Sequence, residues 1–427
     1  MAKTVLKNNS IVVLLTAVIL LPACDSVSEN NQLDQIASGI FSHCENTFVV
    51  SGSRKIYLFE HQPQSVKFNK LAVFDDWAPL SAFLDCANRR IIAPYGARKN
   101  NRNDAGVGII DLESGKKTDY PIVAQGIQGI PVKYRNGILL STTLLKHTKP
   151  SIMSPSYGYL PPGESYQDTQ GLNYRLFAPT VYFDLTSLQF TQYLDLDLGY
   201  SVIEDDVLFA KQRGAITAID LQKKTTDVLY ELTINSTQSK ASNIPLNHLG
   251  VFLDSNYYMA LNRHSQNNSK GKLDGFEKNA IYKLVNGSMV KLATYPFDDA
   301  VYLIGVESKL YIFTNSFNVI EYDLKTQKLA QKQFSSLQAM AGYSIESVGY
   351  THQNFILTLD NQQSEISSKV VLISRDLTQI SSPKSVDLRL ISVTSDLAID
   401  TSDSRGIQLP VNQNLLIEKA ILDIGVN

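Results

Sequence analysis

A short segment with the same order of residue types recurs along this chain, and it constrains the fold more than any other feature. Residues 107–119 read VGIIDLESGKKTD: an apolar run, an acidic residue, a polar turn and a polar restart. Close copies stand at 181–191 (VYFDLTSLQFT), 216–227 (ITAIDLQKKTTD) and 319–329 (VIEYDLKTQKL), and looser ones at 56–66, 281–290 and 370–380. Each copy is typical of a β-hairpin. Because one hairpin cannot bury its own faces, a recurrent hairpin predicts stacked or radially arranged units.

The rest of the chain after residue 45 is also typical of strands. Short apolar runs alternate with turns, and no segment keeps the 3.6-residue periodicity of a helix. Grouped around the hairpin, the runs predict seven units of three or four strands. The first unit has only three runs, at 48–51, 55–59 and 66–69. The apolar residues 415–422 (LLIEKAIL) are the candidate for its missing strand.

We therefore predict an all-β fold: a single β-propeller over residues 45–427, with seven blades and a C-terminal strand that completes the first blade. Six or eight blades stay open, because residues 389–413 fit no unit. A pair of β-sandwiches or a β-solenoid is the structural alternative, but neither explains the recurrence of the hairpin as well.

Residues 1–23 have the features of a secretory signal peptide: a basic start, an apolar run at 11–21 and a small residue before the cut. That run is about half as long as the roughly 20 residues that span a membrane. Residues 21–24 (LPAC) resemble the lipobox of bacterial lipoproteins. The resemblance implies that Cys24 becomes the N-terminus, carries fatty acyl chains such as palmitate, and anchors the protein in the bilayer. The alternative is an ordinary signal peptide followed by a chance cysteine.

Residues 24–44 are interpreted as the lipidated cysteine and a flexible tether, because residues 25–35 (DSVSENNQLDQ) are polar and lack aromatic residues. Residues 36–44 fit either a short helical turn or the approach to the first strand. Asp25 follows the cysteine directly. In lipoproteins of enteric-type bacteria an aspartate at this position retains the protein at the inner membrane, so the resemblance implies a body that faces the periplasm. The outer membrane or the cell surface is the alternative location.

Two further cysteines, Cys44 and Cys86, remain in the mature chain. In an oxidising compartment two cysteines favour one disulfide. They give no metal-ligand spacing, and the six histidines are scattered singly, so we predict no metal site.

The strings IIDLESGKK, AIDLQKKTT and EYDLKTQKL resemble the repeats of PQQ-like and YVTN-type β-propellers, in which an aspartate ends a strand before a short turn. The resemblance concerns the fold and does not specify an activity. Quinone-dependent enzymes of the related repeat family carry repeated tryptophans and adjacent cysteines, whereas Trp77 is the only tryptophan here. We predict no cofactor and name no catalytic residue. A formal net charge of −2 gives no reason to expect nucleic acid as a partner.

Two insertions between the runs are rich in contact-forming residues. Residues 88–104 combine Arg89, Arg90 and Tyr95 with the candidate partner-binding residues Arg98, Lys99 and Arg102. Residues 147–179 are rich in Pro, Gly and Tyr and contribute the candidates Tyr157, Tyr159 and Tyr166. Because the insertions leave neighbouring units, they are expected to share a face. The alternative interpretation is a pair of variable solvated loops.

Together these features predict a membrane-anchored periplasmic lipoprotein that binds or scaffolds a protein partner in a cell-envelope process. A binder or hydrolase of small ligands such as sugars or lactones, acting in the propeller channel, is the first alternative. A purely structural or surface-exposed lipoprotein is the second.

Overall fold

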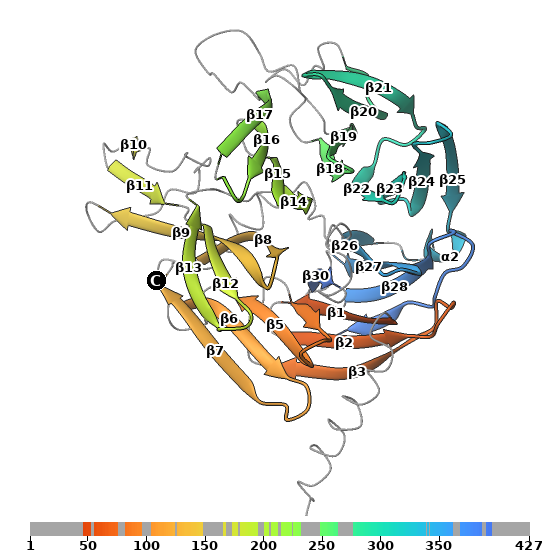
Figure 1. Cartoon of the computed structure of the whole chain (residues 1–427). Coiled ribbons are helices and arrows are strands. Elements are labelled where there is room, and N and C mark those ends of the chain that lie inside the picture. The colour runs from red at the N-terminus through yellow and green to blue at the C-terminus, as the bar shows by residue number, and fades with distance from the viewer. Residues whose placement is uncertain are drawn as a thin grey trace, which may run out of the picture.

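The computed structural model describes the part of the chain that forms the sheets. The described residues are 46–52, 55–75, 82–95, 104–123, 126–147, 165–167, 173–177, 180–194, 200–204, 206–211, 215–223, 225–231, 248–263, 276–338, 340, 342–361, 368–386 and 390–394. They form seven antiparallel sheets arranged in a ring (Figure 1). The protein is therefore a seven-bladed β-propeller, as the recurring hairpin predicts.

Blade 1 joins the two ends of the described chain. It contains β30 (Leu390–Thr394), β1 (Thr47–Gly52), β2 (Lys55–His61) and β3 (Phe68–Asp75), in this order across the sheet. Val49 pairs with Thr394 and Ser51 with Ser392, so a C-terminal strand completes the first blade. The strand that does so is β30, and the expectation that residues 415–422 would take this place is wrong. Residues 415–422 themselves lie outside the described part of the chain.

Blades 2 to 4 follow in chain order. Blade 2 consists of β4 (Phe83–Asp85), β5 (Arg90–Tyr95), β6 (Asp104–Asp111) and β7 (Lys117–Val123). Blade 3 consists of β8 (Gly126–Tyr134), β9 (Gly137–His147), β12 (Thr180–Asp184) and β13 (Gln189–Leu194), with an added hairpin of β10 (Ser165–Gln167) and β11 (Asn173–Phe177). Blade 4 consists of β14 (Tyr200–Glu204), β15 (Val207–Lys211), β16 (Ala215–Asp220) and β17 (Thr225–Glu231).

Blades 5 to 7 complete the ring. Blade 5 consists of β18 (Leu249–Leu253), β19 (Asn256–Ala260), β20 (Ala280–Val285) and β21 (Ser288–Thr294). Blade 6 consists of β22 (Ala300–Val306), β23 (Lys309–Thr314), β24 (Asn318–Asp323) and β25 (Lys328–Gln333), and is followed by the short helix α2 (Ser335–Gln338). Blade 7 consists of β26 (Tyr343–Tyr350), β27 (Asn354–Asn361), β28 (Ser368–Ser374) and β29 (Lys384–Val386).

The hydrophobic core lies between the blades, and each cluster of buried side chains joins two neighbours. Ile92 and Val107 of blade 2, for example, pack with Ile138 and Phe183 of blade 3. Among the described residues there are seven such clusters, one for each junction of the ring. Since burial of apolar surface is the main favourable term in folding, every blade depends on both neighbours for its stability.

The junction between blades 7 and 1 is packed like the others. Phe48 and Phe59 of blade 1 share a cluster with Ile356 and Leu372 of blade 7, and the two phenylalanine rings stack with centroids 5.3 Å apart. The ring is therefore closed by side-chain packing as well as by the backbone pairing of β30 with β1.

Candidate interaction surfaces

The order of the strands divides the disc into two faces. In blades 2 to 7 the turns after the first and the third strand lie on one side, which we call the turn face; examples are residues 86–89 and 112–116 of blade 2. In blade 1 the turn at 62–67, between β2 and β3, lies on this side. The connections between the second and third strands, and those to the next blade, lie on the opposite side. We call that side the insertion face, because the long connections of blades 2 and 3 leave the disc there.

The recurring aspartates lie on the turn face and organise their own turns. Asp323, for example, ends β24, and its Oδ1 accepts hydrogen bonds from the backbone N–H groups of Lys325 (2.9 Å) and Thr326 (2.8 Å). The same geometry recurs at Asp184 and Asp220. Asp111 differs slightly, because its Oδ1 accepts from both the backbone N–H and the hydroxyl of Ser114.

These hydrogen bonds lower the pKa of each turn aspartate, because they stabilise the ionised carboxylate. The donor with the largest effect is the Ser114 hydroxyl for Asp111, a backbone N–H for Asp184, Asp220 and Asp323, and the Ser374 hydroxyl for Asp376. The aspartates thus fix the hairpins that recur in the sequence. Their carboxylate oxygens already accept hydrogen bonds from the protein's own turns.

Most of the ion pairs between described residues also lie on the turn face. Arg135, in the first turn of blade 3, binds Asp206 in the first turn of blade 4 at 3.2 Å, and this contact with the guanidinium is the main cause that lowers the pKa of Asp206. The other pairs on this face are Arg89–Glu113, Arg90–Asp85, Lys223–Asp220, Lys309–Glu321 and Arg375–Glu307. Six pairs of opposite charges between described residues thus lie on the turn face.

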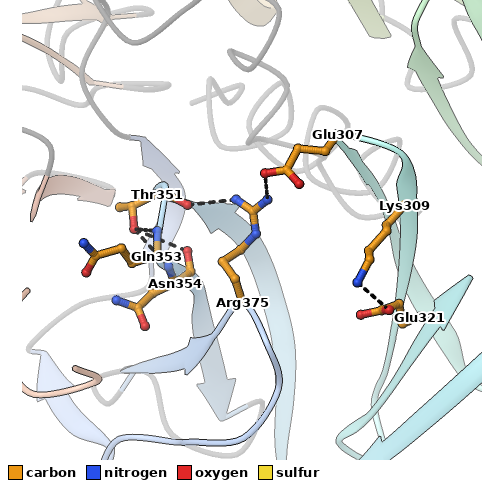
Figure 2. Close-up of polar contacts among 7 residues, drawn as sticks. All are labelled: Glu307, Lys309, Glu321, Thr351, Gln353, Asn354 and Arg375. Carbon is orange, nitrogen blue, oxygen red and sulfur yellow. Dashed lines mark hydrogen bonds and ion pairs between the residues drawn. The ribbon is translucent and has the colours of Figure 1, made fainter. Parts of the chain in front are cut away.

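The junction of blades 6 and 7 shows how one such cation is held (Figure 2). Arg375 follows β28, and its Nη1 donates to the backbone oxygen of Thr351 at 3.1 Å. The guanidinium carbon lies 5.5 Å from the ring centroid of Tyr350 and 5.4 Å from that of Phe355. Glu307 of blade 6 accepts from Nη2 at 3.4 Å, but its side chain is 78% exposed.

An ion pair with so exposed a partner contributes about 0–1 kcal/mol. The carbonyl bond and the two ring contacts therefore hold the half-buried Arg375 more firmly than Glu307 does. Arg375 is therefore held mainly within its own blade 7, and its charge is already used by contacts inside the protein.

Part of the first insertion belongs to the folded blades. The expectation that all of its basic residues form one contact loop is wrong for Arg90. Arg90 Nε binds Asp85 at 2.8 Å, and its Nη2 donates to the backbone oxygen of Leu185 in blade 3 at 2.8 Å. Tyr95 is buried, and its hydroxyl occupies the space that a Cβ on Gly106 would need. Arg90 and Tyr95 are therefore structural. Residues 96–103, which include the candidates Arg98, Lys99 and Arg102, lie outside the described residues.

The second insertion contains secondary structure where the sequence predicted a loop. The strand β11 pairs with the end of β9, from Tyr174 opposite His147 to Phe177 opposite Leu144. The strand β10 then pairs with β11, and Tyr166 stands opposite Tyr174. The candidate Tyr166 is thus carried on a hairpin that extends blade 3. Tyr157 and Tyr159 lie outside the described residues.

The two insertions leave adjacent blades through the same face. The first connects β5 to β6 and the second connects β9 to β12, so each joins the second strand of its blade to the third. In an antiparallel sheet both connections lie on the insertion face. The structure therefore brings the starting points of the two insertions to one side of the disc, opposite the matched charges of the turn face.

The remaining candidate positions are largely outside the described residues. Cys24, Asp25 and Cys44 precede the first described residue. Cys86 is described, lies in the first turn of blade 2, and is disulfide-bonded. Its pairing with Cys44 stays a prediction. Within the described ranges no three His, Cys, Asp or Glu side chains gather as a metal site would require, and no helix there is long and apolar enough to cross a membrane.

Two buried histidines belong to the scaffold, a role that their isolated positions in the sequence did not reveal. His61 of blade 1 contacts Thr351 and Asn354 of blade 7. His248 Nε2 lies 2.5 Å from the hydroxyl of Tyr257, and both residues are buried. The contacts of His61 depend on blades 1 and 7, which meet only in the folded ring, whereas the contact of His248 lies within blade 5.

No protein-family model matches the sequence, and no curated protein matches it. Among solved structures, one described as dihydro-heme d1 dehydrogenase NirN in complex with DHE is 12% identical, with a TM-score of 0.46 over 82% of this chain and 75% of that one. AztD of Citrobacter koseri is 13% identical, with a TM-score of 0.45 over 81% of this chain and 96% of that one. A prolyl endopeptidase is 11% identical, with a TM-score of 0.43 over 86% of this chain and 53% of that one. At these identities the likeness is one of fold alone.

Proposed function

We propose that this protein is a lipid-anchored β-propeller that binds a protein partner in the cell envelope through its insertion face. The observation that carries the proposal is the common origin of the two Arg- and Tyr-rich insertions on one face of adjacent blades. Recognition segments are commonly held on loops and extensions of a rigid scaffold. Tyr and Arg are also the residue types that contribute most to protein interfaces.

The chemical contrast between the two faces supports this choice. On the turn face, carboxylates and cations are joined to one another and to turn backbones, as in the pair Arg135–Asp206. On the insertion face, blade 3 is extended by the hairpin β10–β11. Folded proteins bind to broad surfaces, whereas small ligands bind in concave pockets, so an extended surface suits a protein partner better.

The cellular location of the protein is part of the same proposal. The lipobox-like residues 21–24 favour lipidation of Cys24, and Asp25 favours retention on the periplasmic side of the inner membrane. Two or three acyl chains hold a protein at a bilayer essentially permanently, because each buried CH₂ contributes about 0.8 kcal/mol.

Photo-crosslinking from single positions in living cells tests the proposal. A crosslinking side chain at Tyr166, on the insertion face, should capture one envelope protein at high yield. The same side chain at the exposed Thr326, on the turn face of blade 6, is the matched control. Alanine at Arg98, Tyr157 and Tyr159 should abolish capture from position 166 without lowering the amount of protein. Equal capture from both faces, or none with the protein at normal level, would exclude a protein partner on this face and direct the search to ligands of the channel.

A further inference from the structure

We infer that the turn face of the disc lies toward the bilayer and that the insertion face points away from it, toward the aqueous compartment. This inference rests on the lipid anchor of the proposed function. It adds which side of the propeller a partner can reach, and it follows from where the chain enters the ring.

The chain enters blade 1 on the turn face. Thr47, the first residue of β1, pairs with Glu60 near the end of β2. His61 then leads into the turn at 62–67, which is a turn-face connection. Everything between the lipid anchor and β1 must therefore reach the disc on this side.

A disulfide attaches the same segment to the turn face at a second point. Cys86 lies in the turn between β4 and β5 and packs, partly buried, against the core of the junction between blades 1 and 2. It is disulfide-bonded, and the only other cysteines of the chain, Cys24 and Cys44, both precede β1. The bond therefore ties the N-terminal segment to blade 2, and a lipidated sulfur on Cys24 leaves Cys44 as its partner.

The path that the tether must take favours the turn face as the side that meets the bilayer. Residues 25–43 number nineteen, and a coil of that length has a root-mean-square end-to-end distance of about 24 Å. To pass around the rim the chain must cross three strand spacings, about 14 Å, and one strand length, about 20 Å. This path of about 35 Å takes up about half of the roughly 65 Å contour length of nineteen extended residues, so an inverted disc would restrict the tether, whereas the turn face can meet the bilayer without this detour.

Part of the negative charge on the turn face is neutralised within the protein. A face with unmatched carboxylates would be repelled by anionic lipid headgroups. The acidic Glu113 and Asp206 of this face are instead paired with Arg89 and Arg135. The insertions of blades 2 and 3 then extend on the side that a soluble domain of another protein can approach.

Energy transfer from the disc to labelled lipids tests the orientation. A fluorophore would be placed through a non-canonical residue at Thr326, on the turn face, or at Asp298, on the insertion face beside Arg263. Both side chains are exposed and both positions flank blade 6. The lipidated protein would be reconstituted into vesicles that contain an acceptor lipid. Because a strand length of about 20 Å separates the faces, transfer from Thr326 should exceed that from Asp298 by about twofold or more.

Two controls separate the possible failures. The Cys24→Ser protein should stay in solution, and the double variant Cys44→Ser/Cys86→Ser should bind vesicles with a smaller difference between the two positions. Vesicle-bound protein with equal or reversed transfer would overturn the orientation and leave the lipid anchor standing. Failure of the unsubstituted protein to be lipidated and retained would overturn the anchor and the orientation together.

Discussion

The imidazole Nε2 of His61 lies 3.2 Å from the hydroxyl of Thr351, although the two residues are 290 positions apart in the sequence. The contact joins the first and the last blade on the turn face. Asn354 extends it, because its amide contacts His61 Nδ1 at 3.3 Å and donates to the backbone oxygen of Ser65 at 3.2 Å. This buried polar group of residues is a second link across the closure, beside the pairing of β30 with β1.

Replacement of Thr351 by valine should therefore weaken the closure. Valine keeps the shape but removes a buried hydroxyl that also accepts the backbone N–H of Asn354 at 3.1 Å. We expect a loss of about 1–3 kcal/mol in the free energy of unfolding, measured by denaturant titration. The matched control is Thr294→Val, at an exposed position on the outer strand β21, which should change stability by about 0.5 kcal/mol or less. Equal effects of the two substitutions would show that the contact does not stabilise the ring.

A clash at the junction of blades 4 and 5 gives a second prediction. A Cβ added to Gly250 would lie 2.1 Å from the hydroxyl oxygen of Tyr257 and 2.8 Å from its Cζ. Gly250→Ala should therefore cost about 1–3 kcal/mol through overpacking. Tyr257→Phe removes the nearest atom, so the double variant should lose less than the sum of the single variants. Additive losses in a denaturant-based double-mutant cycle would contradict this account.

The turn aspartates predict how stability changes in acid. Their folded-state pKa values lie below the ordinary value of 3.8 because turn donors stabilise the carboxylates. The stabilisation is fully present above about pH 4 and is lost as the pH falls through the folded-state values. Asparagine at positions 111, 184, 220 and 323 should keep an acceptor for the turn and remove the titration.

The unfolding midpoint of that quadruple asparagine variant should therefore fall less between pH 6 and pH 3 than the midpoint of the unsubstituted protein. Circular dichroism during urea titration measures both. Parallel declines in the two proteins would show that other groups control acid sensitivity.

The disulfide predicts a matched pair of cysteine variants. If Cys86 bonds to Cys44, the bond closes a loop of 43 residues, and its loss costs up to about 4 kcal/mol by the chain-entropy argument. Cys86→Ser and Cys44→Ser should then reduce stability equally, and the double variant should lose no more than either. Thiol alkylation of the denatured protein should find one free cysteine in each single variant. Unequal losses would exclude the pairing.

The closing strand can be tested by truncation. A chain that ends before Leu390 lacks β30 and leaves the inner edge of β1 without its partner. We expect faster proteolysis within blade 1 and a lower midpoint of thermal unfolding than in a chain that ends after Thr394. If instead both chains are equally destabilised, the residues beyond 394 contribute to closure, as the apolar segment 415–422 first suggested.

Much of the fold was predictable because the hairpin signal is local. The turn aspartate, the polar turn and the flanking β-prone runs act within about ten residues, so the recurring segment at 319–329 coincides with β24, its turn and the start of β25. The choice of closing strand was wrong because it depends on a contact over the whole ring. The more apolar segment 415–422 seemed the better strand, whereas the β-prone run LISVT pairs with β1.

The interaction surfaces were harder to predict for the same reason. The run NYRLF at 173–177 is typical of a strand, but its position in a segment rich in Pro, Gly and Tyr hid the hairpin β10–β11. Arg90 and Tyr95 looked like contact residues in the sequence. Arg90 is held by the backbone oxygen of Leu185, and Tyr95 packs against Gly106. Nothing in the sequence indicates that these residues are neighbours.

The first blade contains strands from both ends of the described chain, so it is the last blade that can be completed during synthesis. Val49 pairs with Thr394, which is synthesised 345 residues later, so this pairing cannot form before then. At about 5–20 residues per second this delay lasts about 17–70 s. During that time the strands β1 to β3 have an open inner edge, so a chaperone that covers exposed strands would be most useful to the earliest part of the chain. A stalled or prematurely ended chain would leave the first blade, more than the last, as the target of quality-control proteases.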